Sequence, residues 1–225
     1  LFNPHKFGGD ILLYATTKYI SGSGTTVGGV IVDMGTFSWK TFSGKSVSKF
    51  SKTLGDYAFI AMARKIRSNL GCNLSPFNAF LTSLGLDTLS LRMEKHCSNA
   101  VIIAEALSKL KAIDVVNYPG LKTSSFYKLA KKQYNGSFGA LLTLRLGTKE
   151  RAFEFINNVK IAKNLANIGD TKTLVIHPLS TIFRDFSENE AEQSGVYPDL
   201  VRVSVGLEDP EDIIQDFKQA LAQIK

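Results

Sequence analysis

One lysine near the start of the chain stands between a short apolar run and a loop of small residues. Lys18 follows Thr16 and Thr17 directly and precedes a stretch rich in glycine, serine and threonine that ends at Gly29. A lysine forms a Schiff base with an aldehyde when its amine, whose usual pKa is about 10.4, is made neutral by burial or nearby cations. Hydroxyls and glycine backbone suit a phosphate group. The spacing therefore allows two interpretations: a lysine that binds an aldehyde cofactor carrying a phosphate, or a solvated lysine at a strand end.

The overall composition limits the classes of partner. The 225 residues are 44% hydrophobic and 21% charged, which is ordinary for one or two globular domains. The net charge of +7 comes from scattered basic residues without an arginine-rich run, so no nucleic-acid partner is expected. Apolar runs stay shorter than the roughly 18 residues of a membrane helix, so no membrane partner is expected either.

The thiols and imidazoles are spaced too irregularly for a metal site. Cys72 and Cys97 form no CxxC motif, and the three histidines are isolated in the sequence. We therefore expect no metal, and a reducing cytoplasm is the simplest location for two ordinary thiols. The first residues contain neither a Met nor the apolar segment of a signal peptide, so the chain is interpreted as the interior of a longer protein.

The hydrophobic pattern of the first third predicts a mixed segment. Two short buried strands are expected over 10–15 and 27–33. The stretch 35–52, rich in glycine, serine and lysine, has no clear period and is interpreted as a surface excursion. A helix is expected over 56–70, with Asp56 as a possible N-cap.

A second pattern begins at Ser75-Pro76, which is typical of a helix start. The apolar periodicity then exceeds 30 residues, so a bend or break is expected near Gly85. Strands and helices alternate afterwards and predict an α/β domain with its own sheet, beginning near residue 75. The expected strands are 113–119, 138–146, 173–178 and 201–207, and the expected helices are 126–134, 149–159 and 210–225.

Several stretches together resemble one enzyme family. Thr17-Lys18-Tyr19 and the glycines after it resemble the lysine segment of the Cys/Met-metabolism family of pyridoxal-phosphate (PLP) enzymes. The segments 75–100, 115–121, 167–178 and 200–221 follow in the family's order. The resemblance implies the aspartate-aminotransferase-like α/β fold, PLP fold type I. Residues 1–75 would be the C-terminal portion of the large PLP-binding domain, and 76–225 the C-terminal α/β domain opened by a long interdomain helix.

Within the family, three features are similar to the O-acetylhomoserine sulfhydrylases. They are GTTVGGVIVDMGTFSW (24–39), the extended stretch 35–56, and the segment that begins with Asn167. The resemblance implies γ-replacement on O-acetylhomoserine, in which sulfide displaces acetate and gives homocysteine for methionine biosynthesis. The implied substrates are a small amino acid and sulfide. Methionine γ-lyase and cystathionine γ-synthase or lyase stay open as neighbouring activities, although these enzymes tend to have Ser where Asn167 stands.

The resemblance also implies roles for four residues. Lys18 would bind PLP covalently and move protons between Cα, Cβ and the cofactor. Thr17 would bind the cofactor phosphate, Arg202 would pair with the substrate carboxylate through its planar guanidinium, and Asn167 would lie beside that carboxylate. The sequence alone favours a surface residue at a strand end for Arg202 and an ordinary loop residue for Asn167, and the binding roles come from the resemblance. The family further implies a homo-oligomer, a dimer of dimers with shared active sites.

Three positions depart from the family pattern. Ala15 stands where the family has a Ser three positions before the lysine, so one hydroxyl for the phosphate is missing. Thr16 cannot replace it if the strand continues, because neighbouring strand residues point to opposite faces. Ser23 replaces a His after the lysine, and Phe183 replaces another His near the HPLS segment (177–180).

The family residues that contact the pyridine ring lie upstream of the first residue here. We therefore expect about the C-terminal half of the protein, an incomplete active site, and apolar sheet faces prone to association. Two hypotheses of different class remain. The chain is half of a sulfhydrylase-like enzyme, which the four family residues favour, or a non-catalytic relic or assembly subunit, which the three departures favour.

Overall fold

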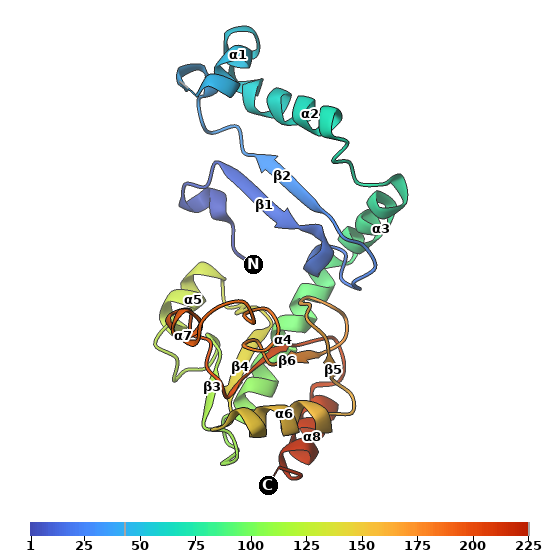
Figure 1. Ribbon diagram of the computed structural model, residues 1–225, viewed down its shortest axis with the longest axis vertical. Coiled ribbons are helices and arrows are strands. Elements are labelled where there is room, and N and C mark those ends of the chain that lie inside the picture. The colour runs from blue at the N-terminus through green and yellow to red at the C-terminus, as the bar shows by residue number, and fades with distance from the viewer. Residues whose placement is uncertain (43, 225) are drawn as a thin grey trace.

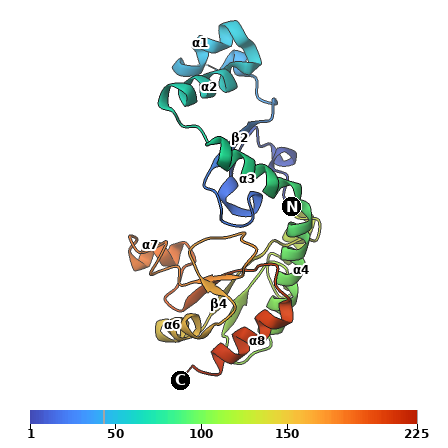
Figure 2. The ribbon, with the colours of Figure 1, turned by 90° about the vertical axis from the view of Figure 1, so that its right-hand side faces the viewer.

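The computed structural model describes residues 1–42 and 44–224 and has two bodies joined by a pair of helices (Figure 1). The N-terminal body contains β1 (Ile11–Ala15), β2 (Gly29–Asp33), α1 (Lys45–Leu54) and α2 (Ala58–Leu70). The helices α3 (Pro76–Asp87) and α4 (Leu89–Leu107) lead from it into the C-terminal body (Figure 2). The predicted boundary at residue 75 falls directly before α3, and the division into two domains there stays a prediction.

Strands β1 and β2 form a two-stranded antiparallel sheet with Ile11 opposite Asp33. Both strands were predicted, but their predicted burial is wrong. Leu13 is 73% exposed and Ile31 is 49% exposed. The reason is that α2 does not close over the sheet: a hollow of about 660 Å³ lies between residues of β2 and α2. Strands that are apolar on both faces are usually covered by a layer on each side. In this chain at least one face of β1 and β2 is left uncovered.

The segment 35–52 is not a plain surface excursion, because it contains most of α1. Val47, Phe50 and Leu54 recur at helical spacing, and Val47 packs with Trp39 and Ala58 in a small core. The many Ser and Lys residues form the outer face of α1 and obscured this period.

The start of α2 also differs from the prediction. Asp56 lies in a short 3₁₀ turn (Gly55–Tyr57) and pairs with Lys40 at 3.0 Å instead of capping the helix. Tyr57 occupies the N-cap and makes no side-chain capping bond. The additional turn moves the helix start beyond the reach of the carboxylate.

The helix pair begins and breaks close to the predicted positions. Ser75 Oγ accepts a hydrogen bond from the Asn78 amide (3.1 Å), and Pro76 lies in the first turn of α3. The break falls at Thr88, three residues after Gly85. A Cβ on Gly85 would lie 2.4 Å from the Ile20 carbonyl oxygen, so the glycine lets α3 touch the chain just after Lys18.

The C-terminal body is built on a five-stranded sheet in the order β3-β4-β7-β6-β5. Only the β5–β6 pair is parallel in this described sheet. The strands are β3 (Val115–Asn117), β4 (Leu141–Arg145), β5 (Lys163–Asn164), β6 (Leu174–Ile176) and β7 (Leu200–Ser204), and the helices are α5 (Tyr127–Gln133), α6 (Lys149–Asn158), α7 (Glu188–Gln193) and α8 (Pro210–Leu221). Every strand and helix predicted for this region is confirmed as a shorter element, and β7 begins one residue earlier than predicted; β5 and α7 were not predicted.

Helices α4, α6 and α8 pack around one continuous core with this sheet. Ile103, Leu144, Phe155, Val203 and Phe217 are fully buried in it. This core fixes the position of β7, the strand that carries Arg202. None of the helices in the described ranges is long and apolar enough to cross a bilayer.

Candidate active site

The chain leaves β1 at Ala15 and forms a five-residue π-helical turn, Thr16–Ile20, which we name the Lys18 turn. The Ser21 amide donates to the Thr16 carbonyl (3.0 Å) and the Gly22 amide donates to the Lys18 carbonyl (2.9 Å). Lys18 itself departs from helical geometry, with φ −90° and ψ −134°. The turn therefore kinks at Lys18 itself, between two backbone hydrogen bonds that close it.

Lys18, Asn167 and Arg202 meet in space although they are far apart in the sequence. Lys18 Nζ donates to Asn167 Oδ1 at 2.6 Å, and Arg202 Nη2 donates to the Asn167 carbonyl at 3.1 Å. Arg202 lies inside the sheet on β7, opposite Thr143 of β4 and Ile176 of β6. Three of the four predicted site residues therefore share one cluster.

Arg202 is suited to an anionic ligand. Among the described residues, no hydrogen bond or ion pair joins Lys18 or Arg202 to a carboxylate. Burial lowers the pKa of Arg202, and the phenol of Tyr19 acts in the opposite direction. A half-buried guanidinium without an acidic neighbour can bind a ligand carboxylate through two parallel hydrogen bonds.

Thr17 lies on the other side of the lysine and contacts Gly28. Its Oγ1 accepts from the Gly28 amide at 3.1 Å and lies 3.4 Å from the Gly28 carbonyl. The structure thus places Thr17 next to the returning strand, without a hydrogen bond to Asn167 or Arg202 in the described part of the chain. Its hydroxyl ties the loop between β1 and β2 together at the lysine.

Thr16 is not a strand residue, because β1 ends at Ala15, so the condition under which Thr16 would point to the opposite face is not met. It begins the Lys18 turn and is buried, and its Oγ1 has no hydrogen-bond partner among the described residues. The Oγ1 of Thr26 is buried and unpartnered in the same way. A Cβ on Gly28 would lie 2.9 Å from Thr16 Oγ1, so the glycine leaves that hydroxyl room. Unsatisfied buried hydroxyls beside a lysine fit a phosphate-bearing aldehyde.

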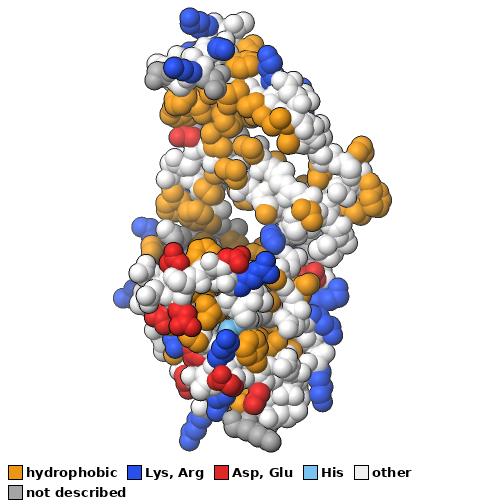
Figure 3. Space-filling view, viewed as in Figure 1, with side chains coloured by type: hydrophobic (Ala, Val, Ile, Leu, Met, Phe, Trp, Pro, Cys, Tyr) orange, Lys and Arg blue, Asp and Glu red, His pale blue; other side chains and the backbone are white. Residues whose placement is uncertain are grey.

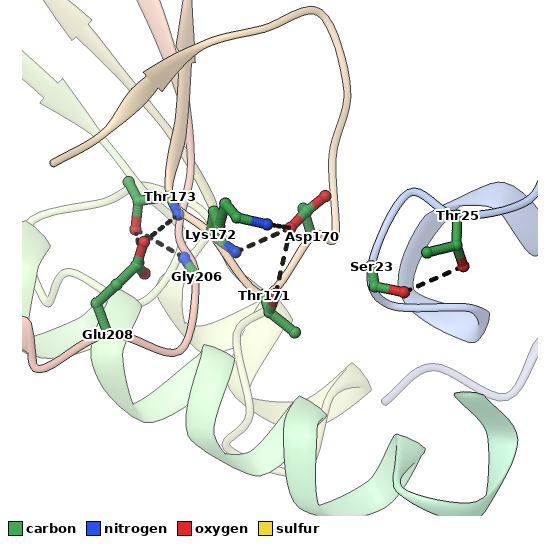
Figure 4. A network of polar contacts seen from close by, with 8 residues as sticks. All are labelled: Ser23, Thr25, Asp170, Thr171, Lys172, Thr173, Gly206 and Glu208. Carbon is green, nitrogen blue, oxygen red and sulfur yellow. Dashed lines mark hydrogen bonds and ion pairs between the residues drawn. The ribbon is translucent and has the colours of Figure 1, made fainter. Parts of the chain in front are cut away.

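The loop that carries Asn167 is held by a polar network (Figure 4). Asp170 Oδ1 accepts from the Lys172 amide at 3.0 Å. The Glu208 carboxylate accepts from the amide and the hydroxyl of Thr173, at 2.6 and 2.9 Å, and Thr173 Oγ1 accepts from the Gly206 amide at 2.9 Å. This network holds the chain directly after Asn167 against the turn that follows β7.

The same loop is joined directly to the Lys18 turn. The Thr171 amide donates to the Gly22 carbonyl at 2.9 Å. A Cβ on Gly169 would lie 2.6 Å from the Tyr19 amide nitrogen, so the glycine allows the two backbones to touch. These contacts could not be predicted from the sequence, because nothing in local spacing indicates which distant loops meet.

Tyr19 was also missed as part of the site. Burial raises the pKa of Tyr19 to about 12, against smaller lowering effects of Ser204 and Arg202. Its ring packs edge-on against His96 of α4 at 5.4 Å between centroids. Tyr19 therefore remains a neutral phenol and anchors the Lys18 turn in the C-terminal body.

None of the three positions that depart from the family pattern makes a side-chain hydrogen bond to Lys18, Asn167 or Arg202 in the described part of the chain. Ala15 ends β1, exposed. Ser23 Oγ lies 3.2 Å from Thr25 Oγ1 on an exposed turn, facing the Asp170 loop in Figure 4. Phe183 packs on Phe186 with ring centroids 5.0 Å apart. No group of three or more His, Cys, Asp or Glu side chains gathers around a common point in the described residues.

Comparison with known proteins decides the family. The sequence profile of the Cys/Met metabolism PLP-dependent enzymes matches residues 1–222. The chain belongs to this family. Its cofactor is pyridoxal phosphate, and the family match agrees with the chemistry of the Lys18 cluster.

Individual relatives support the same family assignment. The homocysteine synthase of Schizosaccharomyces pombe is 42% identical, with 98% of this chain and 54% of that protein covered. The O-acetyl-L-homoserine sulfhydrylase of Leptospira meyeri is also 42% identical, with 100% of this chain and 55% of that protein covered. This chain spans about half the length of these curated relatives.

A solved structure confirms the predicted fold. The protein from Campylobacter jejuni described as an O-acetylhomoserine (thiol)-lyase superposes with a TM-score of 0.86 at 31% identity. The match covers 99% of this chain and 56% of that one, whose structure contains a pyridoxyl-lysine monophosphate. The architecture is therefore the PLP fold type I, as the resemblance implied.

Proposed function

We propose that this chain is the lysine-bearing and carboxylate-binding part of a PLP-dependent enzyme that converts O-acetylhomoserine and sulfide into homocysteine and acetate. The observation that carries the proposal is the pair of hydrogen bonds on Asn167, to Lys18 Nζ (2.6 Å) and to Arg202 Nη2 (3.1 Å). Through these bonds the amine of Lys18 and the guanidinium of Arg202 are both held by Asn167. Relatives at about 40% identity carry names for this reaction, which supports the choice of substrate class.

Bound PLP would supply an aldehyde for covalent attachment and an electron-poor ring that stabilises negative charge at the substrate Cα. Lys18 would hold the cofactor and, once displaced by the substrate amine, take the proton from Cα and return a proton later. Arg202 would bind the substrate carboxylate and so orient Cα toward Lys18. The carbonyl of Asn167 holds Arg202 and its side chain holds Lys18, which fixes the distance between base and carboxylate site.

The cofactor phosphate would lie at the hydroxyls beside the lysine. Thr17 is the predicted ligand, and the free buried hydroxyl of Thr16 adds a donor that partly offsets the missing Ser at Ala15. The complete protein would supply the remaining ring contacts, and a homo-oligomer would share them between chains. The exposed apolar sheet of the N-terminal body supports such an assembly. A cytoplasmic location remains part of the proposal.

A non-catalytic relic or assembly subunit of the same fold is the second candidate. The lost hydroxyl at Ala15 favours it, because each phosphate contact adds to cofactor affinity. The retained cluster around Asn167 argues against it, since a scaffold does not need an arginine in the sheet without an acidic partner.

Product analysis distinguishes these functions. The chain, loaded with PLP, is incubated with O-acetylhomoserine and sulfide, and separately with methionine, and the products are measured by mass spectrometry. Homocysteine that disappears in Lys18→Ala supports the proposal. Formation of 2-oxobutyrate from methionine indicates methionine γ-lyase instead. No product in either reaction, with the chain folded and complemented by the matching half of a relative, contradicts the enzyme and favours the relic.

A further inference from the structure

Arg92 of α4 reaches across to the Lys18 turn and bonds backbone there. Its Nη1 donates to the Tyr19 carbonyl at 2.7 Å, and its Nη2 donates to the Ile20 carbonyl at 3.2 Å. Nη2 also donates to the Gly85 carbonyl at 2.6 Å, and Nε donates to Thr88 Oγ1 at 3.1 Å. The side chain is buried and makes four hydrogen bonds to three separate segments.

These acceptors are groups that local structure leaves without partners. Carbonyls in the last turn of a helix have no following helical N–H to accept from. Gly85 lies in the last turn of α3, and Tyr19 and Ile20 end the Lys18 turn. The guanidinium of Arg92 therefore provides hydrogen-bond donors for carbonyls at the break between α3 and α4 and for carbonyls at the end of the Lys18 turn.

The contact requires close approach of backbone on both sides. A Cβ on Gly22 would lie 2.2 Å from Arg92 Nη1, and Gly22 has a left-handed φ of +76°. A Cβ on Gly85 would lie 2.4 Å from the Ile20 oxygen and 2.6 Å from the Ser21 oxygen. Gly22 leaves the space that the guanidinium fills, and Gly85 lets α3 approach the backbone that the guanidinium binds.

Arg92 has no ion pair with an acidic residue in the described part of the chain. A buried charge costs stability unless it is well hydrogen-bonded, and here carbonyl and hydroxyl oxygens alone surround it. Arg92 therefore holds the two segments together through directed hydrogen bonds and not through an ion pair.

We infer that Arg92 is a positioning residue for Lys18, which holds the Lys18 turn against the break of the helix pair and so keeps the lysine amine at Asn167. The inference rests on the proposed function of Lys18 for its catalytic meaning. The same guanidinium joins the helix break to the turn that carries the reactive amine.

The test compares Arg92→Met and Arg92→Lys with the control Arg151→Met in the full chain. Arg151 of α6 also donates to a backbone carbonyl, that of Ala112, but it does so away from the lysine. Hydrogen exchange of the Ser21 and Gly22 amides, which close the Lys18 turn, is measured by mass spectrometry or NMR. Labelling of Lys18 by a small acylating reagent, relative to exposed lysines, is measured on the protein without cofactor.

Arg92→Met is expected to accelerate exchange at Ser21 and Gly22 about tenfold, as the loss of one or two hydrogen bonds predicts. Acylation of Lys18 should rise with it, while the amides of β7 stay protected. Arg92→Lys should give a smaller change in the same direction, because its single ammonium cannot span the three segments. The control should leave both readouts unchanged.

Unchanged exchange and labelling in a folded Arg92→Met or Arg92→Lys chain would overturn the inference, as would equal changes in Arg151→Met. If Arg92→Met does not fold, the comparison of Arg92→Lys with the control decides. A wild-type chain in which Lys18 never binds PLP, with the exchange effect intact, would refute the proposed function and leave the positioning role standing.

Discussion

The two bodies of the molecule bury their apolar side chains to very different extents. In the C-terminal body, β6 and β7 are almost fully buried beneath α4, α6 and α8. In the N-terminal body, most of β2 is exposed and the core is limited to Trp39, Val47 and Ala58 with a few neighbours. Figure 3 shows the apolar side chains gathered over the N-terminal half.

The large core and the reactive lysine therefore lie in different bodies. The C-terminal body has the core that a stable unit needs and supplies Asn167 and Arg202 from rigid positions. The N-terminal body supplies Lys18 on a two-stranded sheet, which is marginal without further layers. The position of Lys18 therefore depends on contacts with the C-terminal body. Examples are the packing of Tyr19 on His96 and the hydrogen bond from Lys18 to Asn167.

The largest effect should come from the core of the C-terminal body. Phe217→Ala removes a fully buried ring that packs against Phe155 at 5.1 Å, and should lower the free energy of unfolding by about 3–5 kcal/mol. The chain's one tryptophan, Trp39, lies in the N-terminal body, so its fluorescence reports that body alone. In urea, the fluorescence transition should have a lower midpoint than the circular dichroism transition. In Phe217→Ala, only the midpoint of the circular dichroism transition should fall. Coincident transitions would show a single cooperative unit instead.

A smaller effect should follow pH, through His96. Burial lowers the pKa of His96 from 6.5, and its Nε2 has no partner among the described residues. The unfolded chain therefore binds this proton more readily, so stability is full above about pH 6.5 and falls as the pH drops below it. We therefore expect the free energy of unfolding, measured from the dichroism transition, to decrease between pH 7 and pH 5.5. His96→Asn, which keeps a donor for the Val205 carbonyl, should flatten this dependence; an unchanged slope would exclude His96 as its cause.

The smallest effect on stability, about 0.5 kcal/mol or less, is expected for Ile31→Lys on the exposed face of β2. This change should nevertheless reduce self-association, measured by sedimentation velocity, because it places a charge in the apolar sheet face. Val115→Lys on β3 is the matched control, since Val115 is 48% exposed and Ile31 is 49% exposed. Equal dissociation by both variants would show that association does not use the N-terminal sheet.

The sequence predicted the elements of the C-terminal body well because strands with a buried core and amphipathic helices have clear periods. The predicted burial of β1 and β2 was wrong for a physical reason. Their apolar pattern is typical of strands covered on both faces, and in this chain part of their surface is uncovered. The resemblance named Lys18, Thr17, Asn167 and Arg202, but only the structure shows which of them touch. Arg92 and Thr171 act through backbone carbonyls and amides of distant loops, and such contacts leave no local pattern in the sequence.

Covalent trapping of PLP on this chain tests the central claim most directly. The purified chain is incubated with PLP, reduced with borohydride and mapped by peptide mass spectrometry, with Lys18→Arg as the control. One dominant adduct is expected, on Lys18, and it should be absent from the control. Adducts spread over many surface lysines, or no adduct on a folded chain, would contradict it.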